Sequence, residues 1–113
     1  MQLKEHAVGP VTILALSGRM TRNDHFGLLT ERVKDLVHAG RSKLVLNLGG
    51  VSYMDSMCLG EIVSSLVTMR KQSGTLLLSN VPERVERLMQ MVQLSSLFQT
   101  FGSEEEAVRS LVS

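Results

Sequence analysis

Two features of the sequence predict an α/β fold with a mostly parallel or mixed sheet. Short apolar runs alternate with longer segments in which apolar residues recur at helical spacing. Each run ends near glycine or serine residues, which is typical of buried strands followed by turns. The expected order of elements is therefore β-α-β-α-β-α-β-α. Helical crossovers between successive strands favour parallel pairing. Each expected helix carries one apolar stripe, which indicates helices mainly on one side of the sheet.

The first strand and helix are expected before residue 40. Val11–Leu16 is an apolar run that is too short for a helix and is bounded by Ser17-Gly18. Residues 24–39 then change to helical spacing, with Asp24 placed to cap the start and Gly40 placed to end the helix. The apolar face of this helix is formed by Phe26, Leu29, Val33, Leu36 and Val37.

The second strand and helix follow the same pattern. Lys43–Leu48 is predicted to be a buried strand that ends at Gly49-Gly50, and residues 51–58 lead into an amphipathic helix that stops at Gly74. The expected core stripe of this helix is Leu59, Ile62, Val63, Leu66 and Val67. The residues expected to face away from the core are Glu61, Ser64, Ser65 and Thr68.

The remaining third of the chain contains two more strands and two more helices. Thr75–Ser79 is a third buried strand, and Pro82 lies near the first turn of the next helix. Residues 97–101 are expected to form an edge strand. Ser103 and Glu106 then have the spacing of a capping box at the start of a last short helix. The apolar stripes of the two helices are Val85, Leu88, Met89 and Val92, and then Ala107, Val108 and Leu111.

The composition indicates one globular domain over residues 1–113. Lys plus Arg number 12 and Asp plus Glu number 11, so a net charge of +1 argues against direct nucleic-acid binding and a polybasic membrane anchor. No apolar stretch approaches the roughly 20 residues of a membrane-spanning helix, and no signal peptide is recognisable at the start. The single Cys is typical of a reducing compartment. We therefore expect a cytoplasmic protein without membrane insertion.

The sequence carries no motif for metal, cofactor or catalysis. One Cys and three scattered His residues cannot build a zinc cluster. Gly49-Gly50 is not followed by the Lys-Ser or Lys-Thr pair of a phosphate-binding loop, and no serine lies in a nucleophile elbow. We therefore expect no metal, no cofactor and no enzymatic activity.

The junction between the second strand and its helix is the strongest candidate for a functional site. In α/β sheets, functional groups collect where the carboxyl ends of strands meet helix N-termini. Asp55 and Ser56 both suit the N-cap position, because their side-chain oxygens can accept hydrogen bonds from free amides. A phosphoryl group on Ser56 would add about −1.5 to −2 charges beside a helix N-terminus that favours anions. Ser56 is therefore either a cap or a regulatory hydroxyl.

Cys58 lies in the same helical turn and admits two interpretations. It is either a small buried apolar residue or a thiol made reactive by the helix N-terminus. A cysteine-based phosphatase needs an arginine soon after the nucleophile, and Ser64 stands at that position instead. The sequence therefore excludes a phosphatase of this type but leaves a thiol sensor open.

The stretch VLNLGGVSYMDSMCLG, residues 45–60, resembles the core motif of the STAS domain family. The most similar members are the single-domain anti-sigma factor antagonists of bacteria. Their motif is an apolar strand and a turn, then an aromatic residue, an apolar residue, Asp, Ser, Ser or Thr, and Gly-Leu-Gly. Weaker matches are Leu16-Ser17-Gly18, Leu76–Asn80 and Phe98–Leu111, so the resemblance covers nearly the whole chain. It implies one STAS-like domain with a four- or five-stranded mixed sheet and helices along one side.

The resemblance also implies a function as a switch in signalling and transcription regulation. A serine kinase that is itself the anti-sigma factor would phosphorylate Ser56. The unphosphorylated protein would bind this kinase and free its sigma factor, the phosphorylated protein would release it, and a serine phosphatase would reset the switch. The implied partner-binding residues are Asp55, Ser56, Met57, Cys58, Leu59 and Gly60. A weak homodimer is compatible with the sequence.

Three positions depart from the family motif, and they keep a second interpretation open. Met57 replaces the small hydroxyl residue, Cys58 replaces the first glycine of Gly-Leu-Gly, and Thr21 stands where many relatives carry Asp. The alternative is a STAS subunit with a constitutive role, as a scaffold or with a transporter, in which Ser56 is only a helix cap.

Overall fold

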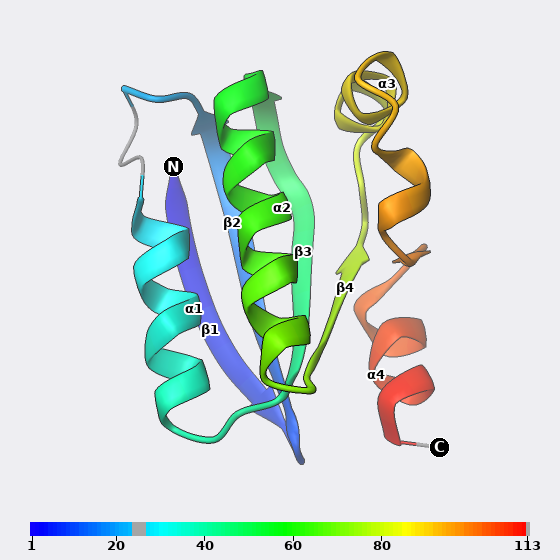
Figure 1. The fold of residues 1–113 in the computed structure, drawn as a ribbon. Coiled ribbons are helices and arrows are strands. Elements are labelled where there is room, and N and C mark those ends of the chain that lie inside the picture. Colours follow the sequence, from blue (N-terminus) through cyan, green and yellow to red (C-terminus); the bar gives the residue numbers. More distant parts are fainter. Residues whose placement is uncertain (24–26, 113) are drawn as a thin grey trace.

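Five strands form one sheet in the order β1-β2-β3-β4-β5 in the computed structural model, which describes residues 1–23 and 27–112 (Figure 1). The elements are β1 (Gln2–Val8), β2 (Val11–Met20), α1 (Leu28–His38), β3 (Lys43–Met54), α2 (Ser56–Lys71), β4 (Thr75–Ser79), α3 (Glu83–Met91), the 3-10 helix η1 (Ser95–Leu97), β5 (Thr100–Phe101) and α4 (Glu104–Val112). β1 and β2 pair antiparallel, and every other neighbouring pair is parallel. The predicted mixed α/β sheet is confirmed.

The helices lie mainly on one face of the sheet. Alternate residues of β2, β3 and β4, such as Leu14, Leu46 and Leu78, pack with α1, α2 and α3 in the larger core cluster. The intervening residues, such as Ile13 and Val45, form a smaller cluster with α4 on the opposite face. Among the described residues, three helices therefore cover one face, and α4 covers part of the other.

The N-terminal strand β1 is absent from the predicted order of elements. Gln2–Val8 pairs with β2 from Gln2 opposite Ser17 to Val8 opposite Val11. As an edge strand, β1 is mostly exposed and has no continuous apolar run, so it lacks the pattern that revealed the buried strands.

Two strands are longer than their apolar runs. β2 continues past Ser17-Gly18 to Met20, and β3 continues through Gly49-Gly50 to Met54. The prediction that these pairs end the strands was wrong. Beyond irregularities in register, the two extensions pair with each other, with Met20 opposite Met54. The glycines end the apolar runs but not the hydrogen-bonded ladder.

The helix α1 is shorter at its start than predicted and ends where expected. It begins after Gly27, and the predicted cap Asp24 and stripe residue Phe26 lie outside the described residues. Gly40 has φ 79°, a conformation that glycine adopts without steric cost. Its amide donates to Val37 and the Arg41 amide donates to Leu36, which are the two bonds of a Schellman motif.

The buried face of α2 differs from the predicted stripe. Val67 is exposed, whereas Glu61 and Ser65, which were expected to face away from the core, are buried. The prediction was wrong at these positions because α2 packs against α1 as well as against the sheet, so a second flank of the helix is covered.

The C-terminal elements follow the sequence pattern with small changes. The expected edge strand over residues 97–101 is divided, since residues 95–97 form η1 and only Thr100–Phe101 pair with β4. Val92 follows the last turn of α3 and is exposed. The Ser103 hydroxyl accepts a hydrogen bond from the Glu106 amide at 3.2 Å, which confirms Ser103 as the cap of α4.

Among the helices of the described residues, none combines the length and apolar character needed to cross a membrane.

Candidate functional site

The candidate site lies where β3 ends and α2 begins. Met54 is the last residue of β3, Asp55 is the N-cap of α2, and Ser56 is its first helical residue. The carboxyl ends of β2 and β3 and the N-terminus of α2 meet at this edge of the sheet (Figure 1). The edge is the one at which α/β folds usually place their binding groups.

Asp55 joins the start of α2 to the end of β2 at this edge. Its Oδ1 accepts a hydrogen bond from the Cys58 amide at 2.9 Å, which is the bond of an N-cap. Its Oδ2 accepts a hydrogen bond from the Arg22 amide at 3.0 Å, just beyond β2. Its own amide donates to the carbonyl of Met20 at 3.0 Å. The predicted capping role is confirmed, and Asp55 also fixes α2 to the end of β2.

These contacts set the protonation of Asp55. Partial burial acts to raise the pKa of the carboxyl group, but hydrogen bonds from the backbone amides of Cys58, Arg22 and Met57 and from the Cys58 side chain act in the opposite direction. The hydrogen bonds prevail, so the pKa of Asp55 lies below the ordinary value for aspartic acid. Asp55 is therefore a carboxylate at neutral pH.

We expect Asp55→Ala to lower the free energy of unfolding at pH 7 by about 1–2 kcal/mol, as the loss of an N-cap typically does. Because the folded-state pKa is lowered, the contribution is present above the unfolded-state pKa of about 4 and is lost as pH falls through the folded-state value. The difference in the free energy of unfolding between wild type and variant should therefore become smaller below about pH 4.

Urea unfolding of both proteins at pH 7 and at about pH 3 measures this change. Asp35→Ala is a suitable control, because the Asp35 side chain is 68% exposed and its ion pair with Arg32 is on the surface. An equal difference in the free energy of unfolding at both pH values would contradict the role assigned to the Asp55 carboxylate.

Ser56 and its neighbours form an exposed surface at the start of α2. Ser56 is exposed on the first turn, and Met57 and Tyr53 are 47% and 44% exposed. Asp55 already caps the helix, so the Ser56 hydroxyl is not needed for that bond. The arrangement leaves an exposed hydroxyl at the helix N-terminus, with two large exposed side chains near it in the chain.

Three arginine residues lie on segments that meet at this edge of the sheet. Arg84 of α3 donates from Nη1 to the carbonyl of Ser52 at 3.2 Å. Arg22 follows β2 and is bonded through its amide to Asp55, and Arg19 lies opposite Tyr53 in the sheet register. All three arginines are exposed. Cationic side chains beside a helix N-terminus favour acidic groups on an approaching molecule.

Comparison with known proteins assigns the family. A sequence model of the STAS domain matches residues 4–107. The chain belongs to the STAS domain family. The anti-sigma-B factor antagonist of Bacillus subtilis (strain 168) is 34% identical over 82 residues, which cover 73% of this chain and 74% of that protein. The family expected from residues 45–60 is confirmed.

Solved structures of anti-sigma factor antagonists share the fold. An anti-sigma factor antagonist from Mycobacterium paratuberculosis has a TM-score of 0.86 at 14% identity, over 99% of this chain and 94% of that one. The anti-sigma factor antagonist SpoIIAA in its unphosphorylated form has a TM-score of 0.82 at 17% identity, over 97% and 96%. Phosphorylated SpoIIAA, from Bacillus, has a TM-score of 0.76 at 16% identity, over 97% and 99%. At these identities the structures establish the fold alone.

The six residues expected to bind a partner do not all lie on the surface of the STAS domain. Ser56, Met57 and Gly60 are exposed and Asp55 is half-buried. Cys58 and Leu59 are 2% and 1% exposed and pack in the core under the first turn of α2. These two residues therefore lie beneath the surface at the start of α2.

The burial of Cys58 leads to a prediction about its thiol. We expect Cys58 to react with a thiol reagent such as Ellman's reagent far more slowly in the native STAS domain than in guanidinium-unfolded protein, because attack requires local opening of α2. The absorbance change with time measures both rates. Rapid stoichiometric labelling of the native protein would contradict this and would favour the thiol-sensor interpretation.

The sequence analysis missed one buried charged residue of the STAS domain, Glu61. Its Oε2 accepts hydrogen bonds from the amide and from the hydroxyl of Thr30, both at 2.9 Å, and its side chain is buried between α2 and α1. Its spacing from Cys58, three residues earlier, places the two side chains on the same face of the helix, but nothing local in the sequence indicates the contact with Thr30. The analysis assigned one apolar stripe to each helix and so placed Glu61 outside it.

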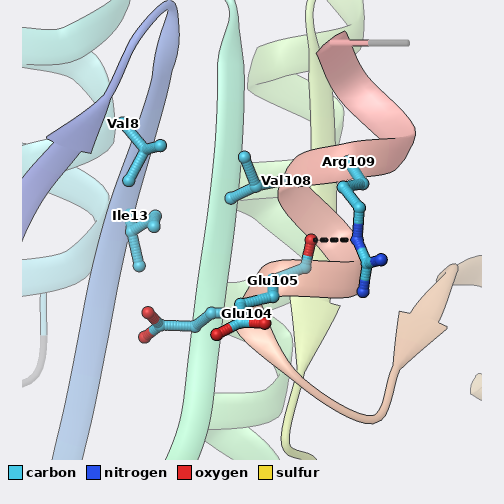
Figure 2. Close-up of a pocket in the computed structure, with 6 residues that line it drawn as sticks. All are labelled: Val8, Ile13, Glu104, Glu105, Val108 and Arg109. Atoms are coloured by element: carbon cyan, nitrogen blue, oxygen red, sulfur yellow. Dashed lines mark hydrogen bonds between the residues drawn. The ribbon is translucent and has the colours of Figure 1, made fainter.

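A separate cavity of about 380 Å³ lies on the opposite face of the STAS domain, between α4 and the β1–β2 hairpin. Figure 2 shows Val8 and Ile13 on one side and Val108 on the other, with the Glu104 carboxylate extending toward β2. Glu104 also accepts a hydrogen bond from Asn47. None of the lining residues comes from α2, so this cavity is not part of the candidate site.

Within residues 1–23 and 27–112, no group of three or more His, Cys, Asp or Glu side chains is placed to hold a metal ion.

Proposed function

We propose that this STAS domain is a phosphorylation-switched anti-sigma factor antagonist. In its unphosphorylated form it binds a serine-kinase anti-sigma factor and releases the sigma factor. Phosphorylation of Ser56 by that kinase ends the complex, and a serine phosphatase restores the binding form. The protein acts by binding and is not an enzyme.

The observation that carries the proposal is the position of the Ser56 hydroxyl. It is exposed on the first turn of α2, directly after a carboxylate that already caps the helix. A phosphoryl group would add about −1.5 to −2 charges at a helix N-terminus, where the dipole and the free amides favour anions. Phosphorylation is therefore compatible with the fold while it reverses the charge of the exposed surface.

The surrounding surface supports a change of partner affinity on phosphorylation. Arg19, Arg22 and Arg84 are exposed on segments at this edge of the sheet, which suits acidic groups on the kinase. A dianion on Ser56 repels acidic groups on the kinase and is costly to bury against an apolar contact. SpoIIAA, which has the same fold, has been solved in an unphosphorylated and in a phosphorylated form. A switch of this kind in a protein of the same fold supports the proposal.

The test is capture of partners from native lysate with immobilised wild type, Ser56→Asp and Ser56→Ala, followed by mass spectrometry. We expect wild type and Ser56→Ala to retain a protein with a serine-kinase domain, and Ser56→Asp to lose it. The captured kinase should phosphorylate the wild type and not Ser56→Ala. Equal retention of one partner by all three proteins, such as a transporter or scaffold subunit, would contradict the switch and favour the constitutive role.

A further inference from the structure

The helix α4 leaves the end of the β1–β2 hairpin partly uncovered. It packs on the sheet through Ala107, which lies with Val45 and Leu77 in the smaller core cluster. Val8, at the end of β1, is 45% exposed. The space between α4 and the hairpin is the cavity of about 380 Å³. This volume lies within the range of small-molecule pockets, which is roughly 300–1,000 Å³.

One part of this cavity is apolar. Figure 2 shows Val8 and Ile13 on one side of it and Val108 on the other. Ile13 is 1% exposed and belongs to the core, so its position is fixed, whereas Val8 is exposed and Val108 is half-buried. An apolar group bound between these side chains would remove more of their surface from water, and this burial favours binding.

A fixed carboxylate also lines the cavity. Glu104 is the first residue of α4, and its side chain extends toward β2 (Figure 2). Its Oε2 accepts a hydrogen bond from Nδ2 of Asn47 on β3, which holds the carboxylate in this orientation. Its Oε1 lies 3.6 Å from Nε2 of His6, which is too long for a hydrogen bond. Among the described residues, Asn47 is therefore the hydrogen-bond donor to this carboxylate, and Oε1 can accept from a bound molecule.

The charges that line the cavity favour a cation. Glu105 contributes a second carboxylate to the lining. Arg109 also lines the cavity, but its guanidinium lies on the side of α4 away from Val8 and Ile13, and its Nε donates to the carbonyl of Glu105 at 3.4 Å (Figure 2). Two carboxylates disfavour an anionic ligand. An ammonium group, by contrast, donates charge-assisted hydrogen bonds to a carboxylate, and these are stronger than neutral ones.

We propose that this cavity binds a small primary amine. The ammonium group of the ligand donates a hydrogen bond to Oε1 of Glu104, and its apolar body packs between Val8, Ile13 and Val108. The lining residues come from β1, β2 and α4, on the face of the sheet opposite α2. The inference therefore goes beyond the proposed function and does not depend on the switch at Ser56.

Titration of the STAS domain with three related probes tests whether the cavity selects a cation. Benzylamine is the cationic probe, and benzyl alcohol and benzoate are its neutral and anionic counterparts. NMR follows the methyl signals of Val8, Ile13 and Val108 at about pH 8, above the range in which histidines usually titrate. We expect benzylamine to shift these signals to saturation and to bind about tenfold or more tightly than either counterpart.

Two pairs of variants test the two parts of the cavity. Glu104→Gln is compared with Glu106→Gln, because both remove a carboxylate from the first turn of α4 and Glu106 is outside the lining. The amide oxygen of the glutamine at residue 104 can still accept from Asn47. Val8→Phe, which fills the apolar part, is compared with Val112→Phe, an exposed valine of α4 outside the lining. Thermal unfolding shows whether each variant is folded.

We expect Glu104→Gln and Val8→Phe each to weaken benzylamine binding about tenfold or more, while the two controls stay within about threefold of the wild type. If Glu104→Gln does not fold, Val8→Phe and the comparison of the three probes still decide the question. Equal affinity for benzylamine and benzyl alcohol would overturn the role of the carboxylate. Equal losses in Glu104→Gln and Glu106→Gln would overturn it as well, since net charge would then explain both. Unchanged methyl signals up to about 10 mM benzylamine would overturn the site itself.

Discussion

Ser56→Asp is expected to weaken binding of the serine kinase by about a hundredfold, since an unfavourable charge at an interface costs several kcal/mol. The added carboxylate lies on an exposed turn that, in the proposed complex, faces acidic groups of the partner. The fold itself should change little, because a negative charge on the first turn of a helix interacts favourably with its dipole. Calorimetry against the purified kinase and thermal unfolding of the free protein measure the two effects separately.

Ser64→Asp provides the matched control for this prediction. Ser64 is also an exposed serine of α2, but it lies two turns beyond Ser56 and away from the helix start. We expect it to keep the affinity of the wild type. Equal loss of affinity in both variants would show that net charge, and not charge at Ser56, controls binding. A large fall in the melting temperature of Ser56→Asp alone would instead show that Ser56 supports the helix.

Gly50→Ala is expected to produce the largest loss of stability among the surface changes considered, about 1–3 kcal/mol from overpacking. A Cβ at residue 50 would lie 2.7 Å from the Cβ of Ser17 and 3.2 Å from the carbonyl oxygen of Leu16. Both are fixed parts of the neighbouring strand β2, so the two strands must move apart. The contact lies where β3 continues beyond its apolar run toward Asp55, so the candidate site should be disturbed as well.

Gly60→Ala separates this steric effect from the general cost of replacing glycine. A Cβ at residue 60 would have no neighbour within 4 Å, and the residue lies inside α2. Alanine in a helix interior is more favourable than glycine by roughly 0.5–1 kcal/mol, so this variant should be more stable than the wild type. Urea unfolding of both variants measures the difference. Stabilisation by Gly50→Ala would contradict the close approach of β2 and β3.

Much of the architecture was predictable from the sequence because it depends on local patterns. The apolar runs at Val11–Leu16, Lys43–Leu48 and Thr75–Ser79 all lie within strands, and Asp55 and Ser103 cap helices as expected. A cap requires only a side-chain oxygen two or three residues before a free amide, and such short-range geometry is visible in the order of residues. The family, too, followed from a contiguous motif, residues 45–60.

The candidate site was only partly predictable. The position of Ser56 beside the cap followed from the chain order, and its role in a switch stays a prediction. The burial of Cys58 and Leu59 beneath the surface, and the arrival of Arg22 and Arg84 from other segments, did not follow from that order. Those features depend on which strands lie side by side and how α2 is rotated on the sheet.

The sequence by itself determined the strands of the core, the helices that connect them, the start of α2 at Asp55 and the STAS family. Only the tertiary structure decided that β3 continues through Gly49-Gly50, that α4 packs on the opposite face and that Glu61 is buried against Thr30. The physical reason is the distance along the chain between the groups involved. The close packing at Gly50 involves Ser17 on another strand, and the burial of Glu61 involves a donor 31 residues away. Neither contact therefore leaves a local pattern in the sequence.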